Sequence, residues 1–354
     1  MERTELSSLG EFGLIDRLTK DNKTINSSTV LSVGDDCAIL QYKDKQILVS
    51  TDAMAEGVHF DMAYTPLKHL GYKAAVTNFS DIYAMNGEPK QIVVSVCVSN
   101  RYSVEALEEL YSGIKLACEM YNVDLVGGDT TSSTGGMFIS ITVIGEVDKG
   151  KEVRRSTAKE NDLICVTGDL GAAYAGLLVL QREKVTWMAN PNVQPELDRY
   201  DYVVGRQLKP EAQKWLIKWL KENNVLPTSM IDISDGLASE ILHICQMSDK
   251  GCEIYANKIP IDYQTASTLE EFQIAAETGA MNGGEDYELL FTISQKDYDK
   301  VKQKDNIHII GYITEKNRGC NLVTPQNTTI EIKAQGFDHY KQNNNTNNNK
   351  QNND

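Results

Sequence analysis

Five acidic clusters are spread along the sequence, and most of them stand where an apolar, strand-like run ends. Carboxylates at strand ends are natural ligands for hard cations such as Mg²⁺. So many carboxylates gathered in one fold would repel one another unless metal and phosphate balanced their charge. The pattern therefore indicates metal–nucleotide chemistry. The clusters are Gly34-Asp35-Asp36, Ser50-Thr51-Asp52, Asn78-Phe79-Ser80-Asp81, Gly127-Gly128-Asp129-Thr130-Thr131 and Asp232-Ile233-Ser234-Asp235-Gly236.

Each cluster also has a structural explanation when it is taken alone. Gly and Asp form ordinary turns, so Asp35 and Asp36 fit a turn. Asp52, Asp129 and Asp235 fit caps of helices or turns. Asn78 and Asp81 are three residues apart, so on a helix they share one face, and a face that simply contacts solvent explains two polar residues there. The structural explanation requires five separate coincidences, whereas one polynuclear Mg²⁺ site explains the whole set, and we favour the site.

The familiar nucleotide-binding signatures do not occur in this sequence. There is no G-x-x-x-x-G-K-[ST] loop, no G-x-G-x-x-G and no protein-kinase motif set. Gly168-Asp169-Leu170-Gly171 is better explained as a tight turn than as a phosphate loop. Metal ions would therefore carry much of any phosphate chemistry.

Charge and cysteine content exclude several classes of function. The 354 residues include 35 basic and 50 acidic side chains, which gives a net charge of −15. Binding to nucleic acid or to an anionic membrane through the overall field is therefore not expected. The seven cysteines have no C-x-x-C spacing, and no leader or membrane-length apolar run occurs. These features predict reduced thiols, with Cys97, Cys118 and Cys165 as small core residues, and a cytoplasmic protein.

Strand and helix patterns alternate and predict an α/β fold with two domains. Strands are expected at residues 46–50, 91–98 and 137–147, the second of them covered on both faces, and a helix is expected at 72–85. Charged, turn-rich residues 148–162 mark the boundary between domain 1–150 and domain 151–340. Later strands are expected at 163–167, 230–233 and 287–293, with helices at 172–180 and from 237. The Asn-rich residues 341–354 are expected to be a disordered tail.

Two basic residues and one histidine are candidates for binding phosphate or substrate. Arg154 and Arg155 are the cations best placed by sequence to meet a phosphate, although a solvated loop explains them equally well. His59 follows the Asp52 cluster closely and is able to reach the same cavity. A lone histidine is more often structural, so spacing alone leaves it unassigned.

The ordered set of motifs closely resembles the thiamine-monophosphate kinase family of the aminoimidazole ribonucleotide synthetase-like superfamily. The resemblance covers about residues 5–340, and the order of the motifs makes it specific. Besides the five clusters, it rests on Gly10-Glu11-Phe12-Gly13-Leu14-Ile15, Gly57-Val58-His59-Phe60, Arg155-Ser156, Gly283-Gly284-Glu285-Asp286-Tyr287-Glu288-Leu289 and Gly336-Phe337-Asp338-His339.

The resemblance implies a fold and a reaction. The fold has two α/β domains with mixed sheets, and the sheet of the N-terminal domain pairs with its counterpart in a homodimer. The reaction transfers a phosphoryl group from ATP to thiamine monophosphate and gives thiamine diphosphate. An acceptor phosphate oxygen is already ionised near neutral pH, so we expect direct in-line transfer without a general base, a catalytic side chain or a phospho-enzyme.

The resemblance also implies site residues, each at a matching position. Several Mg²⁺ ions would be held by Asp36, Ser50, Thr51, Asp52, Asp81, Asp129, Asp232 and Asp235. ATP would contact Tyr111, Gly128, Asp129, Arg155 and Ser234. Thiamine monophosphate would contact His59, Glu285 and Phe337, and Phe337 is suited to stack on a thiamine ring. Asp35 is left as turn structure.

Some positions depart from the family pattern, and other functions compete. Cys37 stands where relatives usually have alanine, residues 207–212 lack the usual arginine, and residues 187–202 match poorly. The main alternative is another ATP-dependent enzyme of the superfamily, such as aminoimidazole ribonucleotide synthetase. A module that only binds divalent metal ions is the second alternative, and it would not require the ordered phosphate-facing glycines.

Overall fold

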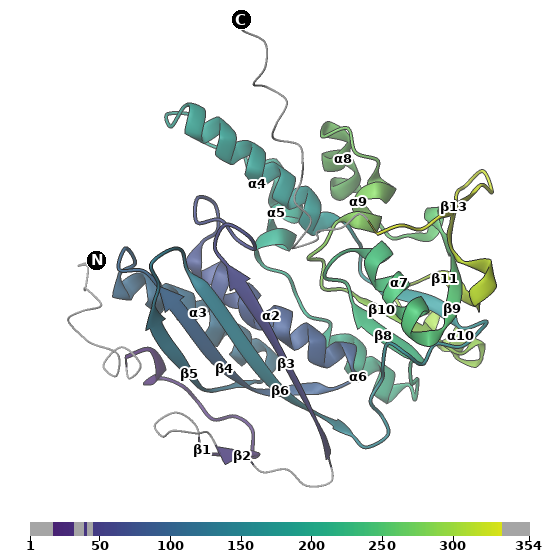
Figure 1. Cartoon of the computed structure of the whole chain (residues 1–354), viewed down its shortest axis with the longest axis horizontal. Helices are drawn as coiled ribbons and strands as arrows, with labels where there is room; N and C mark the ends of the chain where they lie inside the picture. Colours follow the sequence, from purple (N-terminus) through teal and green to yellow (C-terminus); the bar gives the residue numbers. More distant parts are fainter. Residues whose placement is uncertain (1–16, 32–38, 41–44, 335–354) are drawn as a thin grey trace, which may run out of the picture.

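The protein is built on two mixed β-sheets with helices packed between and around them (Figure 1). The structure is a computed structural model that describes residues 17–31, 39–40 and 45–334. Asp36, Phe337 and the predicted tail lie outside the described residues. An antiparallel pair of short strands, β1 (Thr29–Leu31) and β2 (Ile39–Leu40), precedes the first sheet.

The first sheet has four strands in the order β3-β6-β4-β5. Helices α2 (Leu67–Ala84) and α3 (Val104–Tyr121) pack side by side across it. Helix α3 begins where Ser103 accepts a hydrogen bond from the Ala106 amide at 3.3 Å, as a capping serine does. The strands are β3 (Lys45–Ala55), β4 (Glu88–Val98), β5 (Asp124–Ser132) and β6 (Phe138–Asp148).

The helices cover only one face of this sheet, so the prediction that the strand at 91–98 is covered on both faces is wrong. Along β4 and β6 the burial alternates between successive residues, which is the pattern of a sheet with one packed face. Val49 on the uncovered face is 65% exposed, and Ile47 is 41% exposed. The continuous apolar run in the sequence concealed this alternation.

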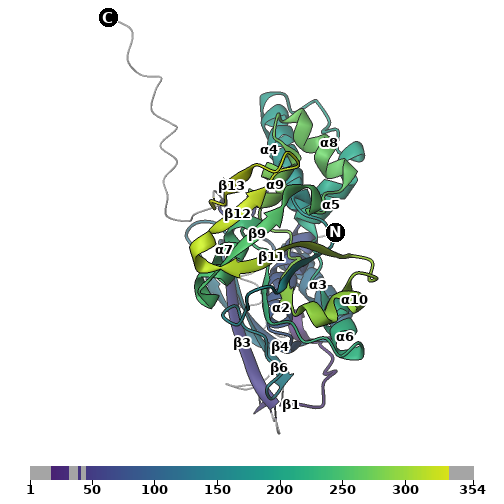
Figure 2. The same ribbon diagram turned by 90° about the vertical axis from the view of Figure 1, so that its right-hand side faces the viewer.

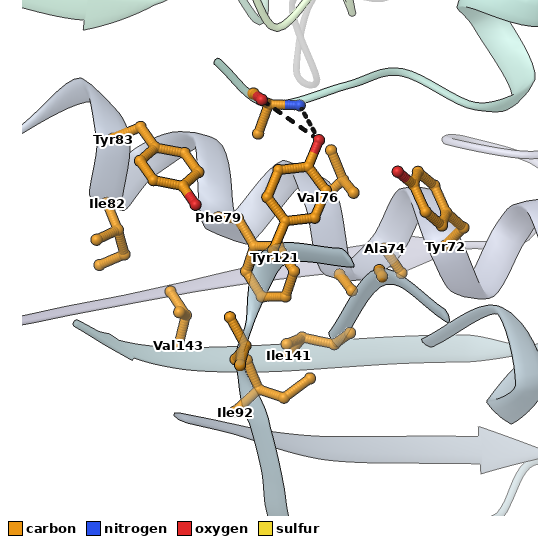
Figure 3. Packing of buried hydrophobic residues seen from close by; sticks show 14 of the residues in the cluster. Tyr72, Ala74, Val76, Phe79, Ile82, Tyr83, Ile92, Tyr121, Ile141 and Val143 are labelled. Atoms are coloured by element: carbon orange, nitrogen blue, oxygen red, sulfur yellow. Dashed lines mark hydrogen bonds between the residues drawn. The ribbon is translucent and has the colours of Figure 1, made fainter. Parts of the chain in front are cut away.

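Helix α2 lies at the centre of the molecule, between the two sheets. One side of α2 packs on Ile92, Ile141 and Val143 of the first sheet (Figure 3). The ring centroids of Phe79 on α2 and Tyr121 on α3 are 5.4 Å apart. The Tyr121 hydroxyl accepts a hydrogen bond from the Ala212 amide at 2.9 Å, which ties the second half of the chain to this core. The same hydrophobic cluster continues into Phe291 of the second sheet.

The second sheet has seven strands in the order β13-β12-β9-β11-β7-β10-β8, all antiparallel to their neighbours except the β12–β9 pair. Figure 2 shows α4, α5 and α8 grouped at the end of the molecule away from the first sheet. The strands are β7 (Leu163–Thr167), β8 (Ser229–Asp232), β9 (Lys250–Tyr255), β10 (Leu289–Ile293), β11 (Ile307–Glu315), β12 (Cys320–Val323) and β13 (Thr329–Glu331). The helices are α4 (Ala172–Ala189), α5 (Asp201–Leu208), α6 (Lys214–Glu222), α7 (Leu237–Ser248), α8 (Tyr263–Glu271), α9 (Ala276–Asn282) and α10 (Tyr298–Val301).

The expected α/β class with mixed sheets is confirmed. The strand expected at residues 163–167 has the same bounds as β7, whereas the helix expected at 172–180 continues to Ala189. Within the poorly matching residues 187–202, the structure has the end of α4, a 3₁₀ turn at Asp198–Tyr200 and the start of α5. The domain bounds themselves stay a prediction. Among the described residues, no helix combines the length and apolar character needed to span a membrane.

Candidate functional site

Three carboxylates from separate parts of the chain come together where α2 lies between the two sheets. Asp52 lies on β3, Asp81 lies on α2, and Asp232 is the last residue of β8. Asp81 raises the pKa of both Asp52 and Asp232, so the three groups are close enough to repel one another. The structure thus brings together residues of three of the five acidic motifs, whereas their binding of metal stays a prediction.

Hydrogen bonds from α2 and β3 hold the carboxylates of Asp81 and Asp232 and the backbone of Asp52. Ser50 donates to Asp81 Oδ2 at 2.6 Å, and the fully buried Ser80 donates to Asp232 Oδ2 at 2.8 Å. Asn78 accepts from the Asp52 amide at 3.1 Å. Ser80 and Asp81 are neighbours on α2. Asp81 therefore faces β3 of the first sheet, while Ser80 holds the carboxylate of Asp232 at the end of β8 in the second sheet.

The cost of burying these charges appears in their pKa values. Burial, with the charge of Asp81 as a second cause, raises the pKa of Asp52 to about 6 and that of Asp232 to about 7. Burial also raises the pKa of Asp81. The positive charge of Arg155 opposes the rise at Asp81 and Asp232, so Arg155 lies near the cluster. The site is therefore suited to bind further positive charge.

Two loops of the second half border this cluster and pack backbone against backbone. The amides of Glu285 and Tyr287 donate to the carbonyls of Ser234 and Ile233 at 2.7 and 2.9 Å. A Cβ on Gly284 would press on the carbonyl oxygen of Ser234, so glycine is required there. This contact explains why the Ser-Asp-Gly and Gly-Gly-Glu-Asp motifs occur together.

Glu285 is held by two side chains that sequence analysis did not identify. Lys73 of α2, 4% exposed, lies 3.0 Å from Glu285 Oε1 and donates to the Gln207 carbonyl at 2.9 Å. The Gln207 side-chain amide donates to Glu285 Oε2 at 2.7 Å. Gln207 belongs to the segment, residues 207–212, that was expected to depart from the family pattern. The signal in the sequence was a lysine within an otherwise mostly apolar helix.

The backbone around Glu285 is unusual for residues that have side chains. Glu285 and Tyr287 have φ angles of 66° and 51°, in the left-handed region that non-glycine residues seldom adopt. Backbone strain of this kind is often found at functional sites. Burial and the charges of Glu285, Asp52, Asp232 and Asp81 raise the pKa of Tyr287. Tyr287 therefore lies between the glutamate and the aspartate cluster.

One buried glutamate, Glu240, was not identified in the sequence analysis. Glu240, in the first turn of α7, accepts from the Asp235 amide at 2.9 Å and from Ser234 Oγ at 3.4 Å. Burial raises its pKa to about 8. Glu240 therefore positions the loop that carries Ser234 and Asp235, while Asp235 itself is exposed.

Two of the expected ligands do not join the carboxylate cluster within this chain. In the strand register, Ala53 of β3 pairs with Ser140, Ser140 pairs with Ser95, and Ser95 pairs with Asp129. Asp129 therefore lies on the edge strand β5, three strand spacings or ~14 Å from β3, which carries Asp52. Thr51 follows Ser50 along β3, so its side chain is on the opposite sheet face. The Thr51 hydroxyl donates to the Ile141 carbonyl at 3.1 Å and accepts from Thr142 at 3.0 Å.

The expected ATP residues Tyr111, Gly128 and Asp129 lie together, near β5. Tyr111 on α3 is hydrogen-bonded to Thr130, and burial raises its pKa to about 12. His59 lies beyond the end of β3, where its Nδ1 accepts from the Ala55 amide at 3.0 Å. The structure therefore places Tyr111, Gly128 and Asp129 at β5 and His59 at the end of β3, and it describes neither Asp36 nor Phe337.

Gly128 offers a test of whether its glycine is structural. A Cβ at Gly128 would overlap the Val94 carbonyl oxygen on β4, whereas a Cβ at Gly127 would meet only Val93 Cγ1 at 3.8 Å. We expect Gly128→Ala to destabilise the fold by about 1–3 kcal/mol or more through overpacking. The matched control Gly127→Ala should be close to neutral. Thermal unfolding of both variants measures the difference, and equal stability would show that β5 is able to move aside.

The sequence of this chain is similar to a known family model and to named relatives. A family model described as "AIR synthase related protein, N-terminal domain" matches residues 34–147. The thiamine-monophosphate kinase of Bacillus subtilis (strain 168) is 34% identical over 340 residues, which is 94% of this chain and 100% of that protein. That of Aquifex aeolicus (strain VF5) is 35% identical over 288 residues, covering 81% of this chain and 87% of that protein.

Solved structures agree with these sequence matches. The thiamine-monophosphate kinase of Stenotrophomonas maltophilia K279a superposes with a TM-score of 0.76 and 28% identity, covering 92% of this chain and 98% of that chain. AaThiL complexed with AMPPCP and TMP superposes with a TM-score of 0.71 and 29% identity, covering 96% and 100%. The hydrogenase maturation protein HypE shares the fold at 15% identity, with a TM-score of 0.73 and coverage of 93% and 98%.

Proposed function

The chain belongs to the thiamine-monophosphate kinase family, and from this we infer that it transfers a phosphoryl group from ATP to thiamine monophosphate, giving thiamine diphosphate. Two groups of comparisons support this function: near-full-length relatives with that name, and a neighbour that binds an ATP analogue together with TMP. Within the chain, the observation that carries it is the convergence of Asp52, Asp81 and Asp232 from three separate elements.

We propose that Asp52, Asp81 and Asp232 bind Mg²⁺, with Asp235 as a further ligand. Carboxylate oxygens are hard donors, and a site of three mutually repelling carboxylates near Arg155 fits a hard divalent cation. Bound Mg²⁺ would neutralise phosphate charge and relieve the repulsion between the two phosphorylated substrates. Ser50, Thr51, Asp36 and Asp129 stay predicted ligands.

In this proposal the protein contributes orientation and charge and no covalent intermediate. The acceptor phosphate oxygen is already ionised, so no side chain has to remove a proton. Arg155 supplies positive charge beside Asp81 and Asp232, and Ser234 and Asp235 are positioned by Glu240. Alignment of acceptor and donor for in-line transfer then accounts for much of the rate.

We propose that Glu285 contacts the thiamine part of the substrate. Lys73 and Gln207 hold its two oxygens in place, and the left-handed backbone at Glu285 and Tyr287 fixes the loop. A carboxylate in a fixed position is able to interact with the cationic thiazolium ring of thiamine. His59 and Phe337 stay predicted contacts to the same substrate.

Magnesium is expected to stabilise the protein more at about pH 8 than at about pH 5. In the folded, metal-free protein, burial raises the pKa of Asp52 to about 6 and that of Asp232 to about 7, against an ordinary value of 3.8 in the unfolded chain. Because the folded state holds these protons more tightly, the stability of the metal-free protein falls as the pH rises from ~4 to ~7. Mg²⁺ binds the ionised carboxylates and offsets this loss. Unfolding temperatures with and without Mg²⁺ measure the effect, and an equal or larger effect at the lower pH would contradict it.

We also propose that the chain forms a homodimer through the uncovered face of its four-stranded sheet. Ile47, Val49 and Phe138 are 41%, 65% and 40% exposed. Exposed apolar patches of this kind mark interaction surfaces.

A cytoplasmic location, which the scattered cysteines predict, stays a prediction.

Direct detection of the product tests the proposed function. Purified full-length protein is incubated with ATP, Mg²⁺ and thiamine monophosphate, and thiamine diphosphate is separated and quantified. We expect product that depends on all three components. No thiamine diphosphate at saturating Mg²⁺ would reject the proposal. Turnover of ATP with an aminoimidazole ribonucleotide precursor would favour the other superfamily reaction, and Mg²⁺ binding without any turnover would favour a binding module.

A further inference from the structure

Three cysteines that the proposed function does not use come together in the second sheet. Cys245 lies in the last turn of α7, Cys252 lies on β9, and Cys320 begins β12. Their sulfur atoms all lie within 4.8 Å of one another. Cys245 and Cys252 are 7 positions apart, and Cys252 and Cys320 are 68 positions apart. These spacings match no metal-binding motif in the sequence.

The strand register makes this convergence a property of the fold. Cys252 and Cys320 are direct partners in the parallel β9–β12 pair, so they share one face of the sheet. Helix α7 packs on that face beside β9 and brings Cys245 to both. The Cys252 amide donates to the Gly319 carbonyl at 3.1 Å, which holds the chain just before Cys320 against β9.

The surroundings of the cluster are apolar on one side and accessible on the other. Cys245 and Cys252 are 2% and 0% exposed, while Cys320 is half-buried. The cluster thus has an entry side at Cys320.

The donor atoms select the kind of ligand. Thiolates are soft donors that favour ions such as Zn²⁺, whereas Mg²⁺ prefers oxygen. A Zn–S bond of ~2.3 Å in tetrahedral geometry places sulfurs ~3.8 Å apart, within reach of the observed cluster after small movements. Among the described residues, no further His, Cys, Asp or Glu joins the group, so the protein offers three ligands. A disulfide would use only two of the three sulfurs.

We propose that Cys245, Cys252 and Cys320 form a three-thiolate site for a soft metal ion, which we identify as Zn²⁺. Water on the accessible side of Cys320 completes the tetrahedron. Binding releases the thiol protons to solvent, and three thiolates with one Zn²⁺ leave a net charge of −1. The site is distinct from the carboxylate cluster, because Cys245 lies at the opposite end of α7 from Ser234 and Asp235. The ion would clamp β12 and α7 to β9 and so stabilise this part of the sheet.

Titration of the reduced, metal-free full-length protein with Co²⁺ and Zn²⁺ tests the proposal. We expect one Co²⁺ per chain with a thiolate-to-cobalt charge-transfer band, which carboxylate ligands do not give, and loss of that band when Zn²⁺ is added. Zn²⁺ should also raise the unfolding temperature. Cys252→Ser should lose both effects, and Cys320→Ser, at the half-buried position, provides the same test if the first variant folds poorly.

The control variant is Cys118→Ser. Cys118 is a buried cysteine on α3, in the hydrophobic core that α2 and α3 form with the first sheet. It should keep the charge-transfer band and the Zn²⁺ stabilisation. The proposal is overturned if the reduced wild-type protein gives no band, or if Zn²⁺ stabilises Cys252→Ser as much as wild type. Loss of two hydrogens on mild oxidation, without Zn²⁺ uptake by the reduced protein, would identify a disulfide pair and would also overturn it.

Discussion

Asp81→Asn is expected to lower turnover of thiamine monophosphate by roughly 10²-fold or more, because a preorganised charge at the reacting phosphates is lost. Asp81 accepts from Ser50 at 2.6 Å and acts electrostatically on both Asp52 and Asp232. Asparagine keeps the shape of the side chain and an acceptor for Ser50. It removes the negative charge that makes Asp81 the central member of the cluster.

The same substitution should leave the metal-free fold intact or make it more stable. Burial raises the pKa of Asp81, which means that its ionised form is disfavoured in the folded protein. Steady-state kinetics at saturating Mg²⁺ and thermal unfolding without metal measure the two effects together. The control is Asp299→Asn, whose side chain is 82% exposed beside Lys302. Turnover within a few-fold of wild type in Asp81→Asn would contradict the metal assignment.

The sequence predicted the types of most elements well and their lengths poorly. The strand at β7 was found with its bounds because a short apolar run ends there at a glycine turn. Helix α4 was underestimated by nine residues because the polar residues near its end, such as Arg182 and Lys184, resemble a loop in sequence. The large apolar residues of its last turns, Val185, Trp187 and Met188, are exposed, so no buried face marks this part of the helix in the sequence.

The candidate site was predictable where a motif places its own side chains. Asn78 and Asp81 share one face of α2 and both face β3, as their spacing predicts. The alternation of side chains along a strand also separates Thr51 from Ser50 and Asp52, and this was readable in advance. Strand order was not readable, and the position of β5 at the edge is what separates Asp129 from Asp52.

Contacts between distant parts of the chain could not be predicted from local pattern. Lys73 meets the Gln207 carbonyl across 134 residues, and Ser80 meets Asp232 across 152. Neither pair has a spacing that would reveal it, because the contact depends on how α2 packs between the sheets. The same reason hid Cys245, Cys252 and Cys320, which the sequence presented as scattered thiols.

Lys73→Met is expected to destabilise the protein and to weaken binding of thiamine monophosphate. Removing one partner of a buried ion pair costs about 3–5 kcal/mol, and we expect about 3 kcal/mol because the Glu285 side chain is 26% exposed. The Gln207 carbonyl also loses its donor. Since Glu285 would no longer be held in place, KM for thiamine monophosphate should rise more than kcat falls. The exposed Lys68 on the same helix gives the control Lys68→Met.

The double variant Lys73→Met/Glu285→Gln separates the two effects of Lys73. Neutralising Glu285 removes the unpaired charge, so the double variant should recover part of the stability that Lys73→Met loses. It should not recover the KM, because the glutamate carboxylate is then absent. Thermal or denaturant unfolding of the four proteins completes the cycle, and steady-state kinetics gives KM for each. If the double variant is no more stable than Lys73→Met alone, Lys73 acts through packing on α2 and not through Glu285.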